Sequence, residues 1–394
     1  MLNLDCSLEF NAARAEEEFF AALPARPAVC LIELREEKAE PFLIRTQNLQ
    51  RRLQRLLGIA DPTSKRLNLR DFARGIRYRL TGSRFEQNLT YYQQAKQLFP
   101  NRYRNLMRLR PPAVLKLNLQ NAYPRCYVTR KIQLDQDGAP ASGSYYGPFP
   151  SRRAAEAFAE RMLDLFKVRR CQIKIRRDPT FPGCIYSEMK MCLAPCFAGC
   201  TKEEYDVEVS RLAQFLETSG GSLRIAYEED REKASEQLDF ERAAALHKKV
   251  EKLDEVLRGQ PEITRRIQDL HAVILQRAAE EQAVGVFAVS GGRLAEPFFL
   301  RFAEIASQPR SAEQIFRDYL ESPANRGNGE LAEHLSLVSR WFYSKPREGE
   351  IFFREKDWPY RRILRACSRL LAPTTGEPEK NPAQGPAPPA EGAS

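Results

Sequence analysis

A cluster of cysteines in the middle of the chain constrains its fold more than any other feature of the sequence. Five of the nine cysteines in this 394-residue chain lie within the range Cys171–Cys200. Four of them follow the spacing Cys171-x12-Cys184-x7-Cys192-x3-Cys196. An odd total of cysteines argues against a disulfide framework. Because proline and glycine beside the thiols let the chain bend, we expect this segment to wrap around a metal centre.

The residue types in this cluster favour an iron–sulfur centre. Four cysteine thiolates suit either a [4Fe–4S] cluster or a structural zinc ion. A zinc ribbon usually presents two Cys-x-x-Cys pairs, and the chain has none, so the cluster is favoured and zinc is the alternative. Basic neighbours are expected to help keep the thiols deprotonated. These neighbours are Arg169, Arg170, Lys174, Arg176 and Arg177. The competing interpretation is a set of unrelated buried cysteines.

The positive charge of the chain is concentrated in one range. The net charge is +10, yet Arg45–Arg110 holds sixteen Lys and Arg against three acidic residues. An excess of this size favours a polyanionic partner, whereas a merely solvated face would mix the two signs. We therefore expect nucleic-acid binding. The predicted DNA-binding residues are Arg45, Arg51, Arg52 and Arg55.

Two features argue against a membrane or secreted protein. The chain has no stretch of 18 uncharged apolar residues, which a membrane-spanning helix would need. Its first residues lack the basic start and apolar core of a secretory signal. We therefore expect a cytosolic protein without a membrane partner.

Local patterns predict both strands and helices. VCLIEL and EPFLI predict a strand hairpin, and Asn48 is expected to cap the helix that follows. Gly143–Pro150 is expected to be a turn-rich junction, after which Ser151 caps another helix. Further along we expect a nearly continuous helical range at 203–257 and then a β-hairpin at 283–302.

The range Glu232–Leu257 predicts a helical hairpin. Apolar residues recur there at a spacing that makes a seam for another helix. They are Ala243, Leu246, Val250, Leu253 and Leu257. Asp239 interrupts the pattern and is expected to cap the second helix. A lone hairpin buries too little surface to be stable. The periodicity alone does not distinguish an ordinary core hairpin from a docking module.

Several segments together resemble one family. The cysteine spacing, the run YYGPFPSRRAAEAF...LFKVRRC and the hairpin LDFERAAALHKKVEKL are similar to UvrC, the excinuclease subunit of bacterial nucleotide excision repair. The run YPRCYVTRKI before them looks like the same family. The resemblance covers Pro27 to Phe302 and is specific from Tyr123 to Leu257. It implies a protein of DNA repair whose partners include DNA.

The resemblance also implies a cofactor and a protein partner. In the family four cysteines hold a [4Fe–4S] cluster, and by position the ligands here are Cys171, Cys184, Cys192 and Cys196. The helical hairpin corresponds to the UVR motif, which pairs with a like motif of UvrB. The matching residues are Leu238, Asp239, Phe240, Glu241, Ala243 and Ala244.

The sequence departs from the family in the N-terminal GIY-YIG nuclease domain. The two tyrosine motifs read Ala28-Val29-Cys30 and Phe42-Leu43-Ile44-Arg45. The helix arginine is kept as Arg52, a catalytic remnant. The acidic metal ligand falls near Tyr92, and Glu86 lies close to it but out of register. Because cleavage by this fold needs a carboxylate for the cation and tyrosines for the water, we expect a domain that binds DNA without cutting it. Mg²⁺ matters only if a nuclease is active.

The C-terminal range departs from the family as well. The family continues into an RNase H-like nuclease, and we find no convincing trio of acidic residues on strands between His271 and Leu371. Aromatic and basic residues in Ser311–Leu371 suit either stacking on nucleic acid or a packed helical core. The packed core is favoured, because Phe and Trp are usually buried.

The expected organisation is α+β. Its parts are a leader helix (1–26), a degenerate, small mixed-sheet GIY-YIG-like domain (27–110), a linker and Cys-rich region (111–202), a helical region (203–258) with the UVR hairpin (232–257), an α/β remnant (259–371) and a disordered tail (372–394). Three functions remain open: a non-cutting repair protein that binds DNA and a UvrB-like partner, a divergent active endonuclease, and a zinc-stabilised scaffold unrelated to repair.

Overall fold

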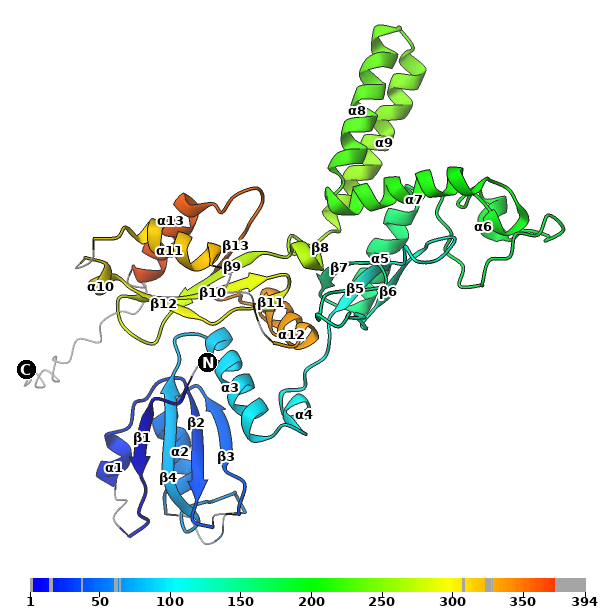
Figure 1. Ribbon diagram of the computed structural model, residues 1–394. Helices are drawn as coiled ribbons and strands as arrows, with labels where there is room; N and C mark the ends of the chain where they lie inside the picture. Colours follow the sequence, from blue (N-terminus) through cyan, green and yellow to red (C-terminus); the bar gives the residue numbers. More distant parts are fainter. Residues whose placement is uncertain are drawn as a thin grey trace, which may run out of the picture.

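The residues that the structure describes form three antiparallel sheets and a projecting helical hairpin, so the expected α+β class is confirmed (Figure 1). The structure is a computed structural model that describes residues 3–13, 17–36, 38–59, 63, 65–306, 309–322, 327 and 329–372. The tail expected to be disordered lies outside these ranges from residue 373 onward. Within them, no helix is both long enough and apolar enough to cross a bilayer.

The first sheet contains four antiparallel strands. Their order is β1 (Cys6–Glu9), β4 (Ala73–Leu80), β2 (Ala28–Leu34) and β3 (Phe42–Thr46). The predicted β2–β3 hairpin is confirmed. Two expectations are wrong. The described strands form no parallel pair, so this sheet is not mixed. The leader also holds more than its helix α1 (Glu17–Ala21), because β1 pairs with β4, a strand far along the chain that no local pattern reveals.

Helices cover both faces of this sheet. The helix α2 (Leu49–Leu57) packs all four of its leucines on one face, and the Asn48 side chain caps it by accepting from the Arg51 N–H at 2.8 Å, as predicted. The helix α3 (Arg84–Leu98) packs on the other face and is followed by α4 (Tyr103–Met107). The core under α3 continues into the C-terminal sheet, where the rings of Phe85 and Phe287 lie 5.1 Å apart.

The second sheet has the order β6 (Cys126–Thr129), β5 (Ala113–Leu117), β7 (Ser144–Phe149) and β8 (Arg265–Arg266), with α5 (Arg152–Leu163) packed against it. The turn-rich junction expected at Gly143–Pro150 is instead mostly the central strand β7. Its side chains alternate between two cores, with Tyr145 in the core shared with the C-terminal sheet and Tyr146 in the core under α5. Burial on both faces therefore overrides the local preference of glycine and proline for turns.

A run with little regular structure follows α5 and leads into three long helices. This run contains α6 (Ile185–Glu188) and the 3-10 turn Pro195–Phe197. The helices are α7 (Lys202–Glu217), α8 (Gly221–Glu236) and α9 (Phe240–Arg258). The helices α8 and α9 form a hairpin that projects away from the sheets (Figure 1). The hairpin is longer than expected, because its first helix begins at Gly221 rather than near Glu232.

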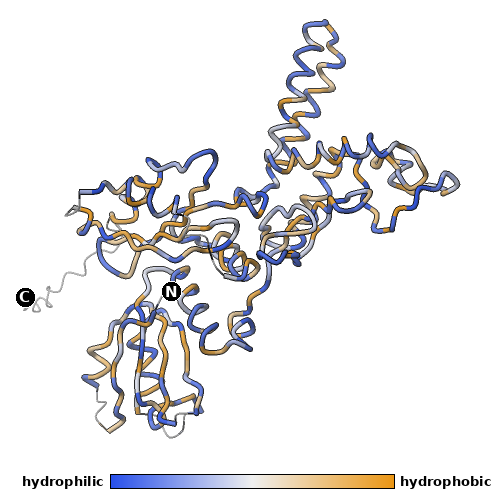
Figure 2. The backbone as a smooth tube through the Cα atoms, viewed as in Figure 1, coloured by the Kyte–Doolittle hydropathy of each residue, from blue (hydrophilic) through white to orange (hydrophobic). Residues whose placement is uncertain are grey.

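The third sheet and its helices form the C-terminal part. The strands are β9 (Ala272–Arg277), β10 (Ala283–Ser290), β11 (Arg293–Leu294), β12 (Phe298–Arg301) and β13 (Glu350–Phe353). The helices are α10 (Phe302–Ala306), α11 (Ala312–Glu321), α12 (Leu331–Phe342) and α13 (Tyr360–Leu371). Trp341, Phe352 and Trp358 are buried, so the interpretation as a packed core is confirmed for them. Hydrophobic residues follow the sheets, whereas the projecting hairpin is largely hydrophilic (Figure 2).

Candidate metal centre and nucleic-acid interface

The predicted DNA-binding arginines do not share one surface. Arg51 and Arg55 are exposed on α2, and Arg52 is half-buried on the same helix. Arg45 lies on the opposite face of the sheet, where it bonds to Asn88 and places its guanidinium 5.3 Å from the Tyr91 ring centroid. The sequence could not show this separation, because it follows from the pleat of β3 and from the side on which α3 packs.

The two positions at which the resemblance would place tyrosine motifs hold core residues. Cys30 is fully buried on the α2 face, and burial raises the pKa of its thiol to about 12. Phe42 packs against the same core. Neither position therefore carries a hydroxyl that can orient water.

Glu86 cannot join Arg52 in a rebuilt site. Glu86 is buried at the start of α3, where it accepts the Gly82 N–H at 2.8 Å and lies 3.5 Å from Arg79 Nε. Arg79 stands opposite Val29, which packs on the α3 face, so Glu86 and Arg52 are attached to opposite sides of the sheet. Burial raises the pKa of Glu86 to about 7, against the lowering effect of Gly82 and Arg79.

Sequence reasoning missed a carboxylate that meets α3 and α4 from the C-terminal part. Glu333 of α12 is buried, and its two oxygens accept four donors. The donors are Tyr92 Oη, Tyr103 Oη and Arg104 Nε, each at 2.6 Å, and Lys96 Nζ at 3.4 Å. Burial raises the pKa of Glu333, but the hydrogen bonds from Tyr103, Tyr92 and Arg104 outweigh burial. The pKa of Glu333 therefore lies below its ordinary value. A carboxylate offers about four lone-pair positions, so this one has none left for a metal ion.

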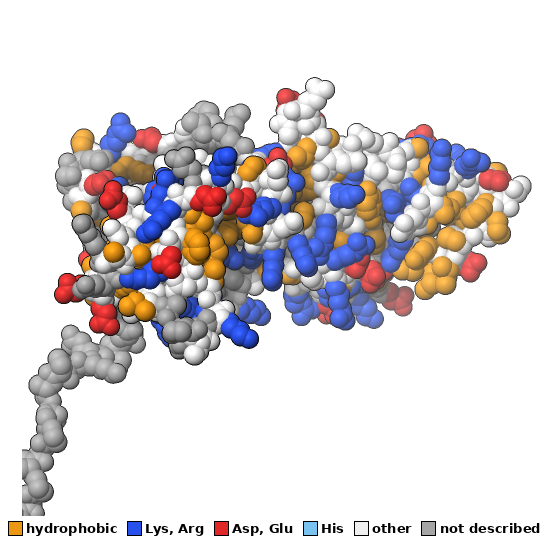
Figure 3. Space-filling model, turned by 90° about the horizontal axis from the view of Figure 1, so that it is seen from below, with side chains coloured by type: hydrophobic (Ala, Val, Ile, Leu, Met, Phe, Trp, Pro, Cys, Tyr) orange, Lys and Arg blue, Asp and Glu red, His pale blue; other side chains and the backbone are white. Residues whose placement is uncertain are grey.

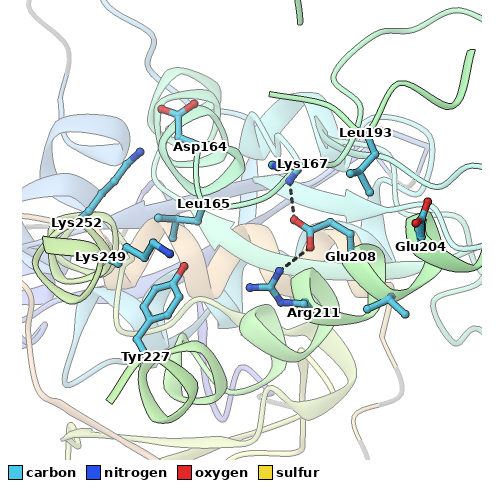
Figure 4. Close-up of a pocket in the computed structure, with 11 residues that line it drawn as sticks. Asp164, Leu165, Lys167, Leu193, Glu204, Glu208, Arg211, Tyr227, Lys249 and Lys252 are labelled. Carbon is cyan, nitrogen blue, oxygen red and sulfur yellow. Dashed lines mark hydrogen bonds and ion pairs between the residues drawn. The ribbon is translucent and has the colours of Figure 1, made fainter. Parts of the chain in front are cut away.

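The cysteine-rich run is tied both to α7 and to the chain just before it. We call residues 171–200 the Cys segment. Shortly before it, the Lys167 N–H donates to Glu208 of α7 at 2.7 Å, and Glu208 also accepts Arg211 at 2.7 Å (Figure 4). The Leu193 N–H donates to the Lys167 carbonyl at 3.0 Å. These contacts close the run into a loop and form one wall of a pocket of about 660 Å³.

A buried arginine organises the start of this loop. Arg169 donates from Nε to the Tyr123 carbonyl at 2.8 Å and from Nη1 to the Ile173 carbonyl at 2.9 Å. The same Nη1 lies 3.8 Å from Cys171 Sγ. At the other end, the Asp178 N–H donates to the Cys196 carbonyl at 2.9 Å. The chain is therefore folded back so that distant cysteines approach each other.

All five clustered thiols interact electrostatically with at least one other thiol of the cluster. Burial raises the pKa of Cys192 to about 11, and Cys171, Cys196 and Cys184 raise it further. Burial also raises the pKa of Cys196, and Cys184 and Cys171 add to this. At Cys192, burial therefore acts against the effect expected of the basic neighbours. Cys200 packs in the apolar core under α5 and α7, where burial raises the pKa of its thiol and, of the other four thiols, Cys196 adds to this.

The donor set fits a thiolate-bound centre in its chemistry. The Ala194 N–H donates to Cys192 Sγ at 3.3 Å, and hydrogen bonds to sulfur are typical around such centres. Across the described ranges, no three Cys, His, Asp or Glu side chains stand close enough to hold a single ion. From Cys171 to Leu193, all of which the structure describes, no side chain is buried.

Several of the predicted partner-binding residues lie at the tip of the α8–α9 hairpin. Leu238 and Phe240 are 72% and 67% exposed, and Asp239 caps α9 by accepting the Arg242 N–H at 3.0 Å. Glu241 and Ala244 are exposed, and Ala243 is half-buried. The predicted seam packs mainly inside the hairpin, where Leu246, Val250 and Leu253 are buried. Leu238 has φ of 56°, in the left-handed region, so the turn holds an exposed leucine in a costly conformation.

Comparison with known proteins identifies the central part of the chain. Residues 113–215 match the family model described as UvrC/Cho excinuclease, middle domain. The UvrABC system protein C of Acetivibrio thermocellus is 25% identical over 252 residues, 60% of this chain and 39% of that protein. The protein of the same name from Ruminiclostridium cellulolyticum is 30% identical over 182 residues, 46% and 28% of the two chains. That of Methanothermobacter thermautotrophicus is 28% identical over 232 residues, 55% and 37%.

These matches set the extent of the relationship. The chain spans at most 39% of the length of these three relatives. No solved structure matches it. The matched range 113–215 contains the second sheet apart from β8, the Cys segment and nearly all of α7. The chain is therefore a UvrC-like protein, related to the UvrABC system protein C through its middle domain.

Proposed function

We propose that this protein acts in nucleotide excision repair, binding DNA and docking on a UvrB-like protein through the tip of its α8–α9 hairpin, without incision activity of its own. The observation that carries the proposal is the exposure of Leu238 and Phe240, 72% and 67%, at the end of a hairpin that follows a UvrC/Cho middle domain. Large apolar side chains at the tip of a projecting, polar hairpin are the kind of patch that binds another protein.

A metal centre in the Cys segment is part of the proposal. Ordering one residue costs about 1–2 kcal/mol of conformational entropy, and apolar burial usually offsets it. Since no side chain from Cys171 to Leu193 is buried, this run needs another source of order. A [4Fe–4S] cluster on Cys171, Cys184, Cys192 and Cys196 would supply it through four metal–thiolate bonds, and zinc is the alternative.

The lack of incision rests on the N-terminal sheet. Cys30 and Phe42 fill the positions of the two tyrosine motifs with core packing. Arg52 and Glu86, the residues left for a divergent nuclease, lie on opposite faces. Arg51 and Arg55 remain exposed on α2 and are available to phosphates, so DNA binding is supported where cleavage is not.

Two measurements on the purified chain test the metal and the chemistry. Anaerobic preparations should contain iron and sulfide and absorb near 400 nm. Zinc without sulfide would show that the Cys segment holds a zinc ion instead of the [4Fe–4S] cluster. A folded protein without metal would show that the Cys segment holds no metal centre. Nicked and lesion-bearing DNA should stay intact with Mg²⁺ or Mn²⁺. Cleavage that Arg52→Ala abolishes would establish the divergent endonuclease instead.

A third measurement tests docking. Binding to a UvrB-like protein should fall at least about tenfold in Phe240→Ala, because a buried aromatic anchor at an interface contributes about 2 kcal/mol or more. Ile225→Ala is the matched control, since Ile225 is 58% exposed near the start of α8, at the other end of the hairpin. Equal binding by both variants and the unaltered chain would show that the tip is not the docking surface.

A further inference from the structure

A hollow beside the Cys segment has the lining of a nucleotide site. Its volume is about 710 Å³, within the range of small-ligand pockets. It lies between β6, α5 and the start of the Cys segment, and it includes Tyr127 and Tyr186. No residue of the N-terminal sheet or of the hairpin tip lines it, so it is distinct from the surfaces proposed above.

Each of the two tyrosines carries an arginine on its ring. The Arg125 guanidinium lies 4.4 Å from the Tyr127 ring centroid, and that of Arg170 lies 5.9 Å from the Tyr186 centroid. Both tyrosines are half-buried, so part of each ring faces the hollow. Unstacked bases bind on aromatic rings and on guanidinium planes. The hollow therefore offers two stacking platforms.

The charges inside the hollow favour an uncharged group. Arg152 pairs with Glu156 at 2.7 Å, and Arg170 pairs with Asp164 at 2.7 Å. Glu160 adds a further carboxylate to the lining. The lining holds three arginines and three carboxylates, so the hollow has no net formal charge that would attract a phosphate. A nucleobase, which is neutral and hydrogen-bonds at its edges, needs no such attraction.

The Cys segment, which contributes Gln172 and Tyr186 to the hollow, has the opposite character elsewhere. Lys174, Arg176, Arg177 and Lys190 are exposed and have no ion pair among the described residues. Ile185 and Met189, one helical turn apart on either side of Tyr186, are 63% and 62% exposed. Seen from below, hydrophobic side chains gather with Lys and Arg at the end of the molecule formed by the Cys segment (Figure 3). Cations meet phosphates, and exposed apolar side chains act as wedges between bases.

We infer that this face binds DNA at an unpaired nucleotide. The base enters the hollow and stacks on Tyr186 and Tyr127, the exposed cations of the Cys segment hold the flanking phosphates, and Ile185 and Met189 fill the gap in the duplex. Removing a base from the stack is least costly where it is already unpaired or damaged, so the site selects such DNA. The inference rests on the proposed function as a DNA-binding repair protein and adds the structure that it recognises.

The test compares a duplex carrying one bulged nucleotide with the fully paired duplex, by fluorescence anisotropy on the metal-loaded full chain. The unaltered protein should prefer the bulged duplex at least about fivefold, because stacking on one aromatic side chain contributes about 1–3 kcal/mol. Tyr186→Leu should lose the preference, whereas Tyr186→Phe should keep it. Ile185→Ser with Met189→Ser should weaken it, and Ile225→Ser, at a 58% exposed control position, should not.

The outcomes separate this inference from the proposed function. Equal affinity for both duplexes, or a preference that survives Tyr186→Leu, overturns the inference and leaves DNA binding in place. A chain that binds neither duplex at low salt rejects the proposed function itself. If the Ile185 and Met189 changes weaken binding to a UvrB-like protein and leave the preference for the bulge intact, the face is a protein-docking surface and the inference is wrong. Metal content equal to that of the unaltered chain confirms that each variant is folded around its centre.

Discussion

The N-terminal sheet and the Cys segment obtain their order in opposite ways. Every residue from Ala28 to Ile32 is buried, and helices cover both faces of the strand they form. No residue from Cys171 to Leu193 is buried, although that run makes specific turns and backbone contacts. Apolar burial therefore suffices for the first region, whereas the proposed metal centre would supply the order of the second.

The two regions also differ in which chemistry they retain. In the N-terminal sheet, the motif positions carry Cys30 and Phe42, which stabilise the core and have no catalytic hydroxyl. In the Cys segment, four thiols remain within electrostatic reach of each other. The difference supports the proposal that this chain binds DNA and a protein partner without cutting DNA.

The largest expected effect comes from removing one thiol. Cys192→Ser should lose all of the metal and leave amides from Cys171 to Leu193 almost unprotected in hydrogen exchange, because the remaining ligands cannot hold the centre. Cys200→Ser is the control, since Cys200 packs in the core under α5 and should leave the metal in place. Full metal content in Cys192→Ser would remove the contrast between the two regions.

A core truncation should act on the other region alone. Leu53→Ala creates a cavity under α2 and should lower the free energy of unfolding by about 2–5 kcal/mol in denaturant titration. The metal content should not change, because Leu53 lies in a separate core. Gln54→Ala, at an exposed position on the same helix, controls for helix effects. Loss of metal in Leu53→Ala would show that the regions depend on each other.

The buried Glu86 should make stability depend on pH. Its pKa in the folded chain is about 7, above the ordinary 4.5, so the folded state holds the proton more tightly. The contribution of protonated Glu86 to the free energy of unfolding is complete below about pH 4.5 and is lost as pH rises through 7. Glu86→Gln should therefore stabilise the chain by up to about 3 kcal/mol at pH 8 and by little at pH 4.5. Urea titrations at both pH values measure this, with Glu241→Gln as the exposed control. A gain confined to low pH would contradict the sign.

The smallest effect should come from the basic helix face. Arg51→Ala with Arg55→Ala should lower the affinity for duplex DNA about fivefold at low salt. The slope of its salt dependence should flatten by about 0.9 for each phosphate that the variant no longer neutralises. Arg45→Ala should change the affinity and the salt slope less, because Arg45 lies on the other face of the sheet, against Asn88 and Tyr91. Equal effects of the three arginines would show that DNA binds both sides of the sheet.

Features that depend on a few neighbouring residues could be predicted from the sequence. The caps at Asn48, Ser151 and Asp239 are present as expected, because a short polar side chain satisfies the first free N–H groups of a helix. The β2–β3 hairpin and the β10–β11 pair within the expected range 283–302 follow from short apolar runs separated by turn residues. The metal ligands remain a prediction.

Features that depend on distant residues could not be predicted. The strand β7 was hidden because its glycines and prolines suggest turns, and only burial between two cores makes it a strand. The saturation of Glu333 by α3 and α4 joins residues about 230 positions apart, and no local signal marks it. The nucleotide-sized hollow likewise forms only where β6, α5 and the Cys segment meet.

The sequence by itself determined the kinds of group this protein carries: a thiol cluster, an excess of arginine and a hairpin with an apolar tip. The tertiary structure alone decided which of these groups can act together. It separated Arg45 from Arg51 and Arg55, enclosed Glu86 away from Arg52, and brought four thiols within electrostatic reach of each other while packing Cys200 in a core. The physical reason is that composition and spacing set chemistry and local conformation, whereas the side of a sheet on which a helix packs is settled only when all the apolar faces are buried together.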